Sequence, residues 1–197
     1  MNAYDRIHTL DFIIWKGWPA NPLNLFALAI QIGTDEASHV SIAHKVNDRV
    51  SHFEAIASGF RQNAFNINDR GLLCIRRLNW DALFERAAVE TAQIRMLARM
   101  YKMCDERNGY GYGNILAAAA KILFRYKTPN RQPILDRDDS TICSEAASRI
   151  VRLEGLPGVK AKFENAITGN NLADAWVWPV HFLKSENLIT IWQKGES

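Results

Sequence analysis

Residues 38–57 read SHVSIAHKVNDRVSHFEAIA, and the expected fold is built outward from this stretch. Asn47-Asp48 is a two-residue turn signal between two segments with strand character, which predicts a β-hairpin over 38–57. If these two residues form the turn, Val46 pairs with Arg49. The pairing of every later residue then follows, because side chains alternate between the two faces of a strand.

This register places a histidine and a carboxylate on one face of the hairpin. His39 and Glu54 are diagonal neighbours in it, roughly 7–8 Å apart at the backbone, a span that a glutamate side chain can bridge. His44 falls on the opposite face, whereas His52 shares the face of Glu54 but lies next to the turn. One interpretation is a solvated cross-strand pair. The small and apolar residues around the pair favour another, a carboxylate that orients a catalytic imidazole.

The remaining segments complete an α+β plan, a small antiparallel sheet packed against helices. Strands are expected at 10–15 and 72–78, helices at 21–33, 80–106, 114–124 and 142–153, and a loop at 125–139. Asn79 is the expected cap of the long helix. The apolar stripe of that helix is expected to consist of Leu83, Phe84, Ala87, Ala88, Ile94, Leu97, Ala98 and Tyr101.

Composition indicates one globular domain over residues 1–197. Hydrophobic residues make up 48% of the chain and charged residues 23%, which excludes disordered and collagen-like classes. The net charge is only +3 and the basic residues are spread along the chain, which argues against a dedicated nucleic-acid binder. The longest apolar run, 23–32, is far shorter than the roughly 20 residues of a membrane-spanning helix, so no transmembrane segment is expected.

The chain has three cysteines, Cys74, Cys104 and Cys143, with no Cys-x-x-Cys pair. This argues against a disulfide framework and against a cysteine-rich zinc site, and no metal or cofactor is expected. The first residues lack the pattern of a signal peptide, which predicts synthesis in the cytoplasm. Action elsewhere would then need lysis or a secretion machine that uses no cleavable signal.

Cys143 differs from the other two cysteines in its context. It follows Asp139-Ser140-Thr141, which are good capping residues, and opens a predicted helix. The positive end of the helix dipole and the unpaired backbone N–H groups there favour a thiolate and can hold an oxyanion. The alternative is a cysteine that fills the first turn of a buried helix. Cys74 and Cys104 are interpreted as packing residues.

In their order and spacing, several segments are similar to those of one family, the circularly permuted branch of the NlpC/P60 superfamily of papain-like cysteine hydrolases. This branch includes the YiiX/YebB-like proteins, and its histidine precedes its cysteine, as here. Leu10 stands where the family has a glycine. The matching segments are DFII at 11–14, SHVSI at 38–42, FEA at 53–55, IRRL at 75–78, GYGY at 109–112, DDSTICSE at 138–145 and WPVHFL at 178–183.

The resemblance implies a papain-like fold in permuted order, with Cys143 as the nucleophile, His39 as the base and Glu54 as the residue that orients it. The oxyanion would be held by the backbone N–H of Cys143 and one further donor. The residues expected to supply that donor or to line the substrate cleft are Tyr110, Tyr112, Ser38 and Trp18.

By resemblance, the expected activity is that of a cysteine amidase or peptidase that forms an acyl-enzyme on peptides of the bacterial cell wall. The alternative is a thiol acyltransferase, or a hydrolase of lipid or other esters, because relatives in the permuted branch act on lipid acyl groups. A third possibility is a binding module that kept the fold without catalysis. Whether an inhibitor or immunity partner exists is left open by the sequence.

Overall fold

A computed structural model describes residues 3–16, 37–56, 59–106, 109–110, 140–141 and 143–195. The expected helices at 21–33 and 114–124 and the expected loop at 125–139 lie outside these residues. Trp18 and Tyr112 also lie outside them.

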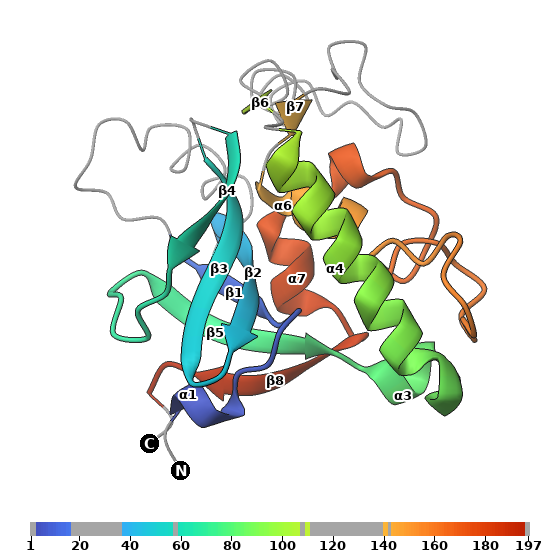
Figure 1. Cartoon of the computed structure of the whole chain (residues 1–197), viewed down its shortest axis with the longest axis horizontal. Helices are drawn as coiled ribbons and strands as arrows, with labels where there is room; N and C mark the ends of the chain where they lie inside the picture. The colour runs from blue at the N-terminus through green and yellow to red at the C-terminus, as the bar shows by residue number, and fades with distance from the viewer. Residues whose placement is uncertain are drawn as a thin grey trace.

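The fold is of the α+β class, as expected. Its centre is a six-stranded antiparallel sheet with the strand order β4-β3-β2-β1-β5-β8. Three helices, α4 (Val89–Asp105), α6 (Cys143–Ile150) and α7 (Pro179–Lys184), lie on one side of it (Figure 1). The strands are β1 (Phe12–Trp15), β2 (His39–Val46), β3 (Arg49–Ile56), β4 (Gly59–Ala64), β5 (Leu72–Leu78) and β8 (Leu188–Gln193).

The hairpin of β2 and β3 has the register that its turn predicts. Val46 pairs with Arg49, and the same register continues to Ile42 opposite Phe53. Asn47 has a φ of 53°, the left-handed conformation that two-residue hairpin turns require and that asparagine tolerates. On the other side of β2, β1 continues the sheet and places Trp15 opposite His39.

The sequence does not predict the edge strand β4. Its residues read GFRQNA, and they pair with β3 from Gly59 opposite Ile56 to Ala64 opposite Ser51. Edge strands often carry polar side chains, which discourage pairing with other chains. The strand therefore lacks the apolar alternation by which strands are found in a sequence.

The expected continuous helix over 80–106 is wrong. The chain forms a short helix α3 (Trp80–Leu83), a 3-10 turn η2 (Arg86–Ala88) and then α4. Phe84 leaves the helix in an extended conformation, and its side chain is fully buried. The backbone of Phe84 bridges to Val159, a tertiary contact that outweighs local helix propensity.

Leu83 and Phe84, the first two residues of the expected apolar stripe, are buried, but because α4 starts afresh after the break the stripe is wrong along α4. Ile94 and Tyr101 are 58% and 42% exposed. The residues of α4 that are buried are Ala92, Met96, Met100 and Met103. The cap of α3 is confirmed, since the Asn79 side chain accepts a hydrogen bond from the backbone N–H of Ala82.

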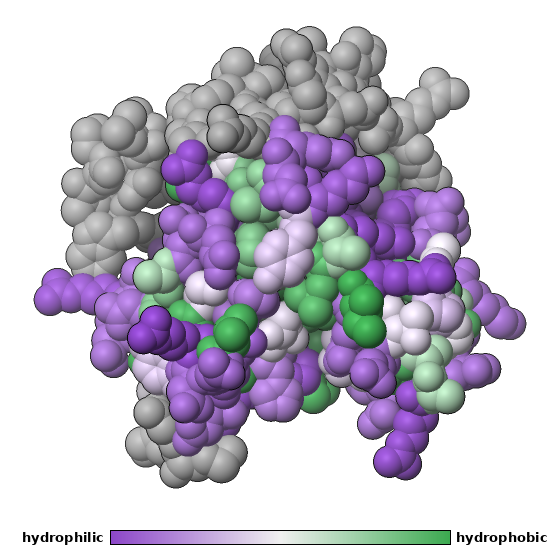
Figure 2. Space-filling view, in the orientation of Figure 1, coloured by the Kyte–Doolittle hydropathy of each residue, from purple (hydrophilic) through white to green (hydrophobic). Residues whose placement is uncertain are grey.

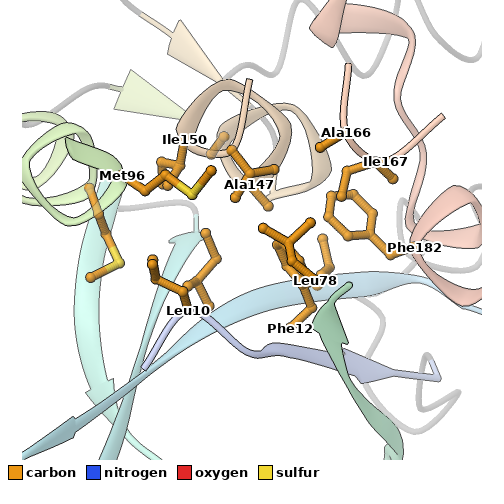
Figure 3. Packing of buried hydrophobic residues seen from close by; sticks show 14 of the residues in the cluster. Leu10, Phe12, Leu78, Met96, Ala147, Ile150, Ala166, Ile167 and Phe182 are labelled. Atoms are coloured by element: carbon orange, nitrogen blue, oxygen red, sulfur yellow. The ribbon is translucent and has the colours of Figure 1, made fainter. Parts of the chain in front are cut away.

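Two clusters of buried apolar side chains lie on the two faces of the sheet. In the larger, shown in Figure 3, Met96 of α4 and Ile150 of α6 point towards Leu10 and Phe12 of the sheet side. The smaller cluster, on the opposite face, includes Ile13 and packs beneath the short helix α1 (Ala3–Arg6). On the face seen in Figure 2, apolar residues form small groups that hydrophilic residues separate.

Leu10 is fully buried and has a φ of 73°, a left-handed conformation that residues other than glycine rarely adopt. The next residue, Asp11, accepts two hydrogen bonds from the guanidinium of Arg77, at 2.7 and 2.9 Å. This ion pair ties the start of β1 to β5. Within the part of the chain that the structure describes, no helix is long and apolar enough to span a membrane.

Candidate active site

Cys143 is the first residue of α6, a helix that packs across β2 and β3. Its next turn carries Ala146 and Ala147, which are both buried in the larger core cluster. Because these side chains are small, the helix axis can approach the sheet closely. Cys143 is 5% exposed and lies at the end of the helix where backbone N–H groups have no partner within the helix.

His39 is the first residue of β2 and is bonded to Glu54 on β3. The distance from His39 Nε2 to Glu54 Oε2 is 2.5 Å. The side chain of His39 is 27% exposed and that of Glu54 is 14% exposed. The two groups are therefore largely withdrawn from water, unlike a solvated cross-strand pair.

The His39 imidazole also hydrogen-bonds the Cys143 side chain. Since Nε2 is used by Glu54, Nδ1 is the ring nitrogen left for the sulfur. Burial lowers the pKa of His39, but the charge and hydrogen bond of Cys143 and the bond to Glu54 outweigh it and raise this pKa to about 10.

The pKa of Cys143 moves in the opposite direction. Burial raises it, but the positive charge and the hydrogen bond of His39 lower it, and the backbone N–H groups of Val40 and Ser144 add to this effect. The net pKa of Cys143 is below the ordinary value of a thiol. These opposite shifts favour the state in which the proton resides on His39 and the sulfur is a thiolate.

Glu54 has different partners on its two carboxylate oxygens. Oε2 binds His39, and Oε1 accepts a hydrogen bond of 2.7 Å from Nδ2 of Asn63 on β4. Burial raises the pKa of Glu54, but the hydrogen bond and charge of His39 lower it to about 2, with help from His52 and Asn63. The carboxylate is ionised throughout the physiological range.

His52 is a second histidine beside the carboxylate. Its Nδ1 lies 2.8 Å from Ser41 Oγ, and its Nε2 lies 4.0 Å from Glu54 Oε1. Burial lowers the pKa of His52, more than Glu54 raises it. His52 is therefore a neutral neighbour of the His39–Glu54 pair and does not form a second ion pair with the Glu54 carboxylate.

Two residues that contact the site were missed by sequence reasoning. Asn63 lies on β4, which the sequence does not predict, so nothing marked it. The Trp15 ring centroid is 5.4 Å from that of His39 and 5.2 Å from that of His52, so the indole covers both imidazoles. Trp15 could have been identified if the strand at 10–15 had been expected to pair with the hairpin, because that pairing places Trp15 opposite His39.

The other two cysteines have the surroundings expected of packing residues. Cys74 is 4% exposed, and burial raises its pKa to about 11. Cys104 is half-buried near the end of α4. Neither has a histidine hydrogen bond among the described contacts.

The expected lining residues are only partly described. Ser38 is buried next to His39, and its backbone N–H donates to the Trp15 carbonyl at 2.9 Å. Tyr110 belongs to β6 (Gly109–Tyr110), which pairs in parallel with β7 (Ser140–Thr141), just before Cys143. Trp18 and Tyr112 lie outside the described residues. The second oxyanion donor therefore stays a prediction.

The described residues contain no group of three or more His, Cys, Asp or Glu side chains that could hold a metal ion. The site brings together the Cys143 thiol, the His39 imidazole and the Glu54 carboxylate in a chain of hydrogen bonds. These are the elements of nucleophilic catalysis by a cysteine with an oriented base.

In comparisons with known proteins, neither a protein-family model nor a curated protein matches this chain.

Proposed function

We propose that this chain is a cysteine hydrolase that cuts an amide or ester bond through an acyl-enzyme. The observation that carries the proposal is the buried chain of hydrogen bonds from Cys143 to His39 and from His39 to Glu54. A purely structural pair would not need a thiol whose pKa is lowered at the start of a helix.

The first half of the reaction forms the acyl-enzyme. The Cys143 thiolate attacks the carbonyl carbon of the substrate, a carbon–sulfur bond forms, and the carbonyl oxygen becomes an oxyanion. The backbone N–H of Cys143 is the proposed first donor to that oxyanion. As the tetrahedral intermediate collapses, His39 gives its proton to the leaving nitrogen or oxygen.

The second half of the reaction releases the acid. His39, now neutral, takes a proton from water as the water oxygen attacks the thioester carbon. The carbon–sulfur bond breaks, and the thiolate and imidazolium are restored. Throughout, Glu54 holds His39 by Nε2, which fixes the ring orientation and stabilises its charged form.

We propose further that the chain belongs to the circularly permuted, papain-like branch of the NlpC/P60 superfamily, with cell-wall peptides as the substrate class. The order of histidine before cysteine and the segments quoted above support this assignment. So does an α+β fold in which a helix opening with the cysteine packs on the strand that carries the histidine.

The test is incubation of the purified protein with peptidoglycan and, in parallel, with a panel of acyl esters, followed by mass spectrometry of the products. Cys143→Ala is the inactive comparison, and Cys104→Ala is the matched control, because it removes a cysteine outside the site. Release of stem peptides by the wild type and by Cys104→Ala, but not by Cys143→Ala, supports the proposal. Products from lipid esters alone would replace the substrate class, and no product from either would refute catalysis.

A further inference from the structure

Two adjoining cavities lie beside Trp15, the residue whose indole contacts the His39 imidazole. The first, of about 420 Å³, is lined by Trp15, Lys16, Asp69, Arg70 and Gly71. The second, of about 490 Å³, lies between β5, β8 and α7. Lys16 lines both cavities, so they meet at this residue. Each has the volume of a small-molecule site.

Positive charge is concentrated around these cavities. Lys16, Arg70, Arg76 and Lys194 line one or both of them, and the single carboxylate among their described lining residues is that of Asp69. The whole chain has a net charge of only +3, so this excess is local. A concave surface with one sign of charge attracts ligands of the opposite sign.

The charges around the cavities are held in place by the fold. Arg76 is 9% exposed, and its guanidinium donates to backbone carbonyls at the end of α7, among them those of Phe182 and Ser185. None of the described ion pairs joins Arg76 to a carboxylate. The Lys194 ammonium donates to the Arg70 carbonyl at 2.6 Å, which keeps it at the junction.

Donors remain for a ligand. Lys16 and Arg70 are exposed at the junction, and each carries N–H groups for which no partner is described. Thr190 and Gln193 add neutral donors to the wall of the second cavity. Charge-assisted hydrogen bonds from such groups suit carboxylate and phosphate oxygens.

We propose that these cavities form a subsite that binds an anionic group of the substrate, a carboxylate or a phosphate. The inference rests on the proposed function, because it makes the cavities part of the same active site. Lys16 directly follows Trp15, and the Trp15 ring centroid is 5.4 Å from that of His39. Trp15 also lines the first cavity, so an anion bound there would lie beside the residue that contacts the base.

The test measures binding in the Cys143→Ala protein, so that it does not depend on turnover. The probes are inorganic phosphate, glutarate and the uncharged analogue glutaramide, and the readout is the NMR signal of the Trp15 indole N–H, assigned with Trp15→Phe. The test variant is Lys16→Gln with Arg70→Gln. The matched control is Arg86→Gln with Lys162→Gln, which removes the same charge at exposed positions away from the cavities.

We expect phosphate or glutarate to shift the Trp15 signal in a saturable way, and glutaramide not to shift it. The test variant should weaken that binding at least about tenfold, the effect of losing charged hydrogen bonds, and the control should not. The stronger of the two anions identifies the ligand chemistry. An equal loss in both double variants, or no saturable shift with either anion, would overturn the subsite.

The binding test and the hydrolysis test together distinguish failure of the proposed subsite from failure of the proposed function. If the anions fail to bind while the wild type still hydrolyses peptides or esters, the subsite is refuted and the proposed function stands. If the anions bind and no substrate is cut, the cavities are an anion site without the catalytic role assigned to them, and the proposed function fails.

Discussion

Replacing Glu54 with glutamine tests the site at its most informative point. The change keeps the size of the side chain but removes the negative charge that lies 2.5 Å from His39 Nε2. A hydrogen bond to a charged group contributes about 1.5–3 kcal/mol, which alone corresponds to roughly tenfold to a hundredfold in rate. Loss of the orientation of the ring adds to this, so the hydrolysis rate should fall by about one to four orders of magnitude.

The substitution Glu54→Gln should also change how the hydrolysis rate depends on pH, in a direction that the pKa shifts determine. The pKa of His39 is raised to about 10 in part by Glu54, and that of Cys143 is lowered by the charge of His39. Without the carboxylate, the imidazolium is less stable, so the pKa of His39 should fall and that of Cys143 should rise. The acid limb of the rate profile should move to higher pH and the alkaline limb to lower pH, which narrows the active range.

Two measurements check this prediction. Alkylation of Cys143 by iodoacetamide, followed from pH 4 upward, reports the pKa of the thiol, and NMR of the imidazole protons reports that of His39. The matched control is Glu90→Gln, which removes an exposed carboxylate in the first turn of α4. If Glu54→Gln keeps the rate and both pH limbs of the wild type, the carboxylate does not orient the base, and His52 would be the next residue to test in that role.

Three further predictions follow from the same contacts. Iodoacetamide should modify Cys143 before either other cysteine at neutral pH, because His39 lowers its pKa; peptide mass spectrometry gives the order, and earlier modification of Cys104 would remove Cys143 as the nucleophile. Asn63→Leu should slow hydrolysis about tenfold more than Gln62→Ala, whose side chain lies on the other face of β4, since only Asn63 binds Glu54. Equal rates would show that the carboxylate needs no support from β4. Leu10→Gly should lower the free energy of unfolding in urea by about 1–3 kcal/mol, because the loss of a buried leucine exceeds the left-handed strain that is relieved. Higher stability would mean that the backbone strain at Leu10 outweighs the packing of its side chain.

The hairpin could be predicted because a two-residue turn leaves no freedom in the register. Once Val46 faces Arg49, the face of every later residue is determined, and His39 and Glu54 are brought together without any knowledge of the rest of the fold. The start of α6, expected at about residue 142, lies at Cys143, and that expectation also came from residue types close by in the sequence. Both inferences use short-range chemistry only.

The parts that could not be predicted depend on contacts between distant segments. The helix that Asn79 caps ends after one turn because Phe84 is buried and its backbone bridges to Val159. No local pattern carries that information. Because the break was not expected, the apolar stripe was placed wrongly along α4, where Ile94 is exposed. The edge strand β4 escaped notice because Phe60 is its only buried side chain and the residues that follow it are polar or exposed.

The charges of the site explain why its supporting residues are hard to find in a sequence. In the state that the pKa shifts favour, a thiolate at Cys143, an imidazolium at His39 and a carboxylate at Glu54 sum to one negative charge in a largely buried place. The groups that stabilise this charge among the described contacts are neutral donors, the Asn63 amide and two backbone N–H groups. A cation in place of Asn63 would pair with Glu54 and weaken its hold on His39. A neutral amide satisfies the free carboxylate oxygen and leaves the charge to act on the imidazolium, but an isolated asparagine or a backbone N–H forms no recognisable motif.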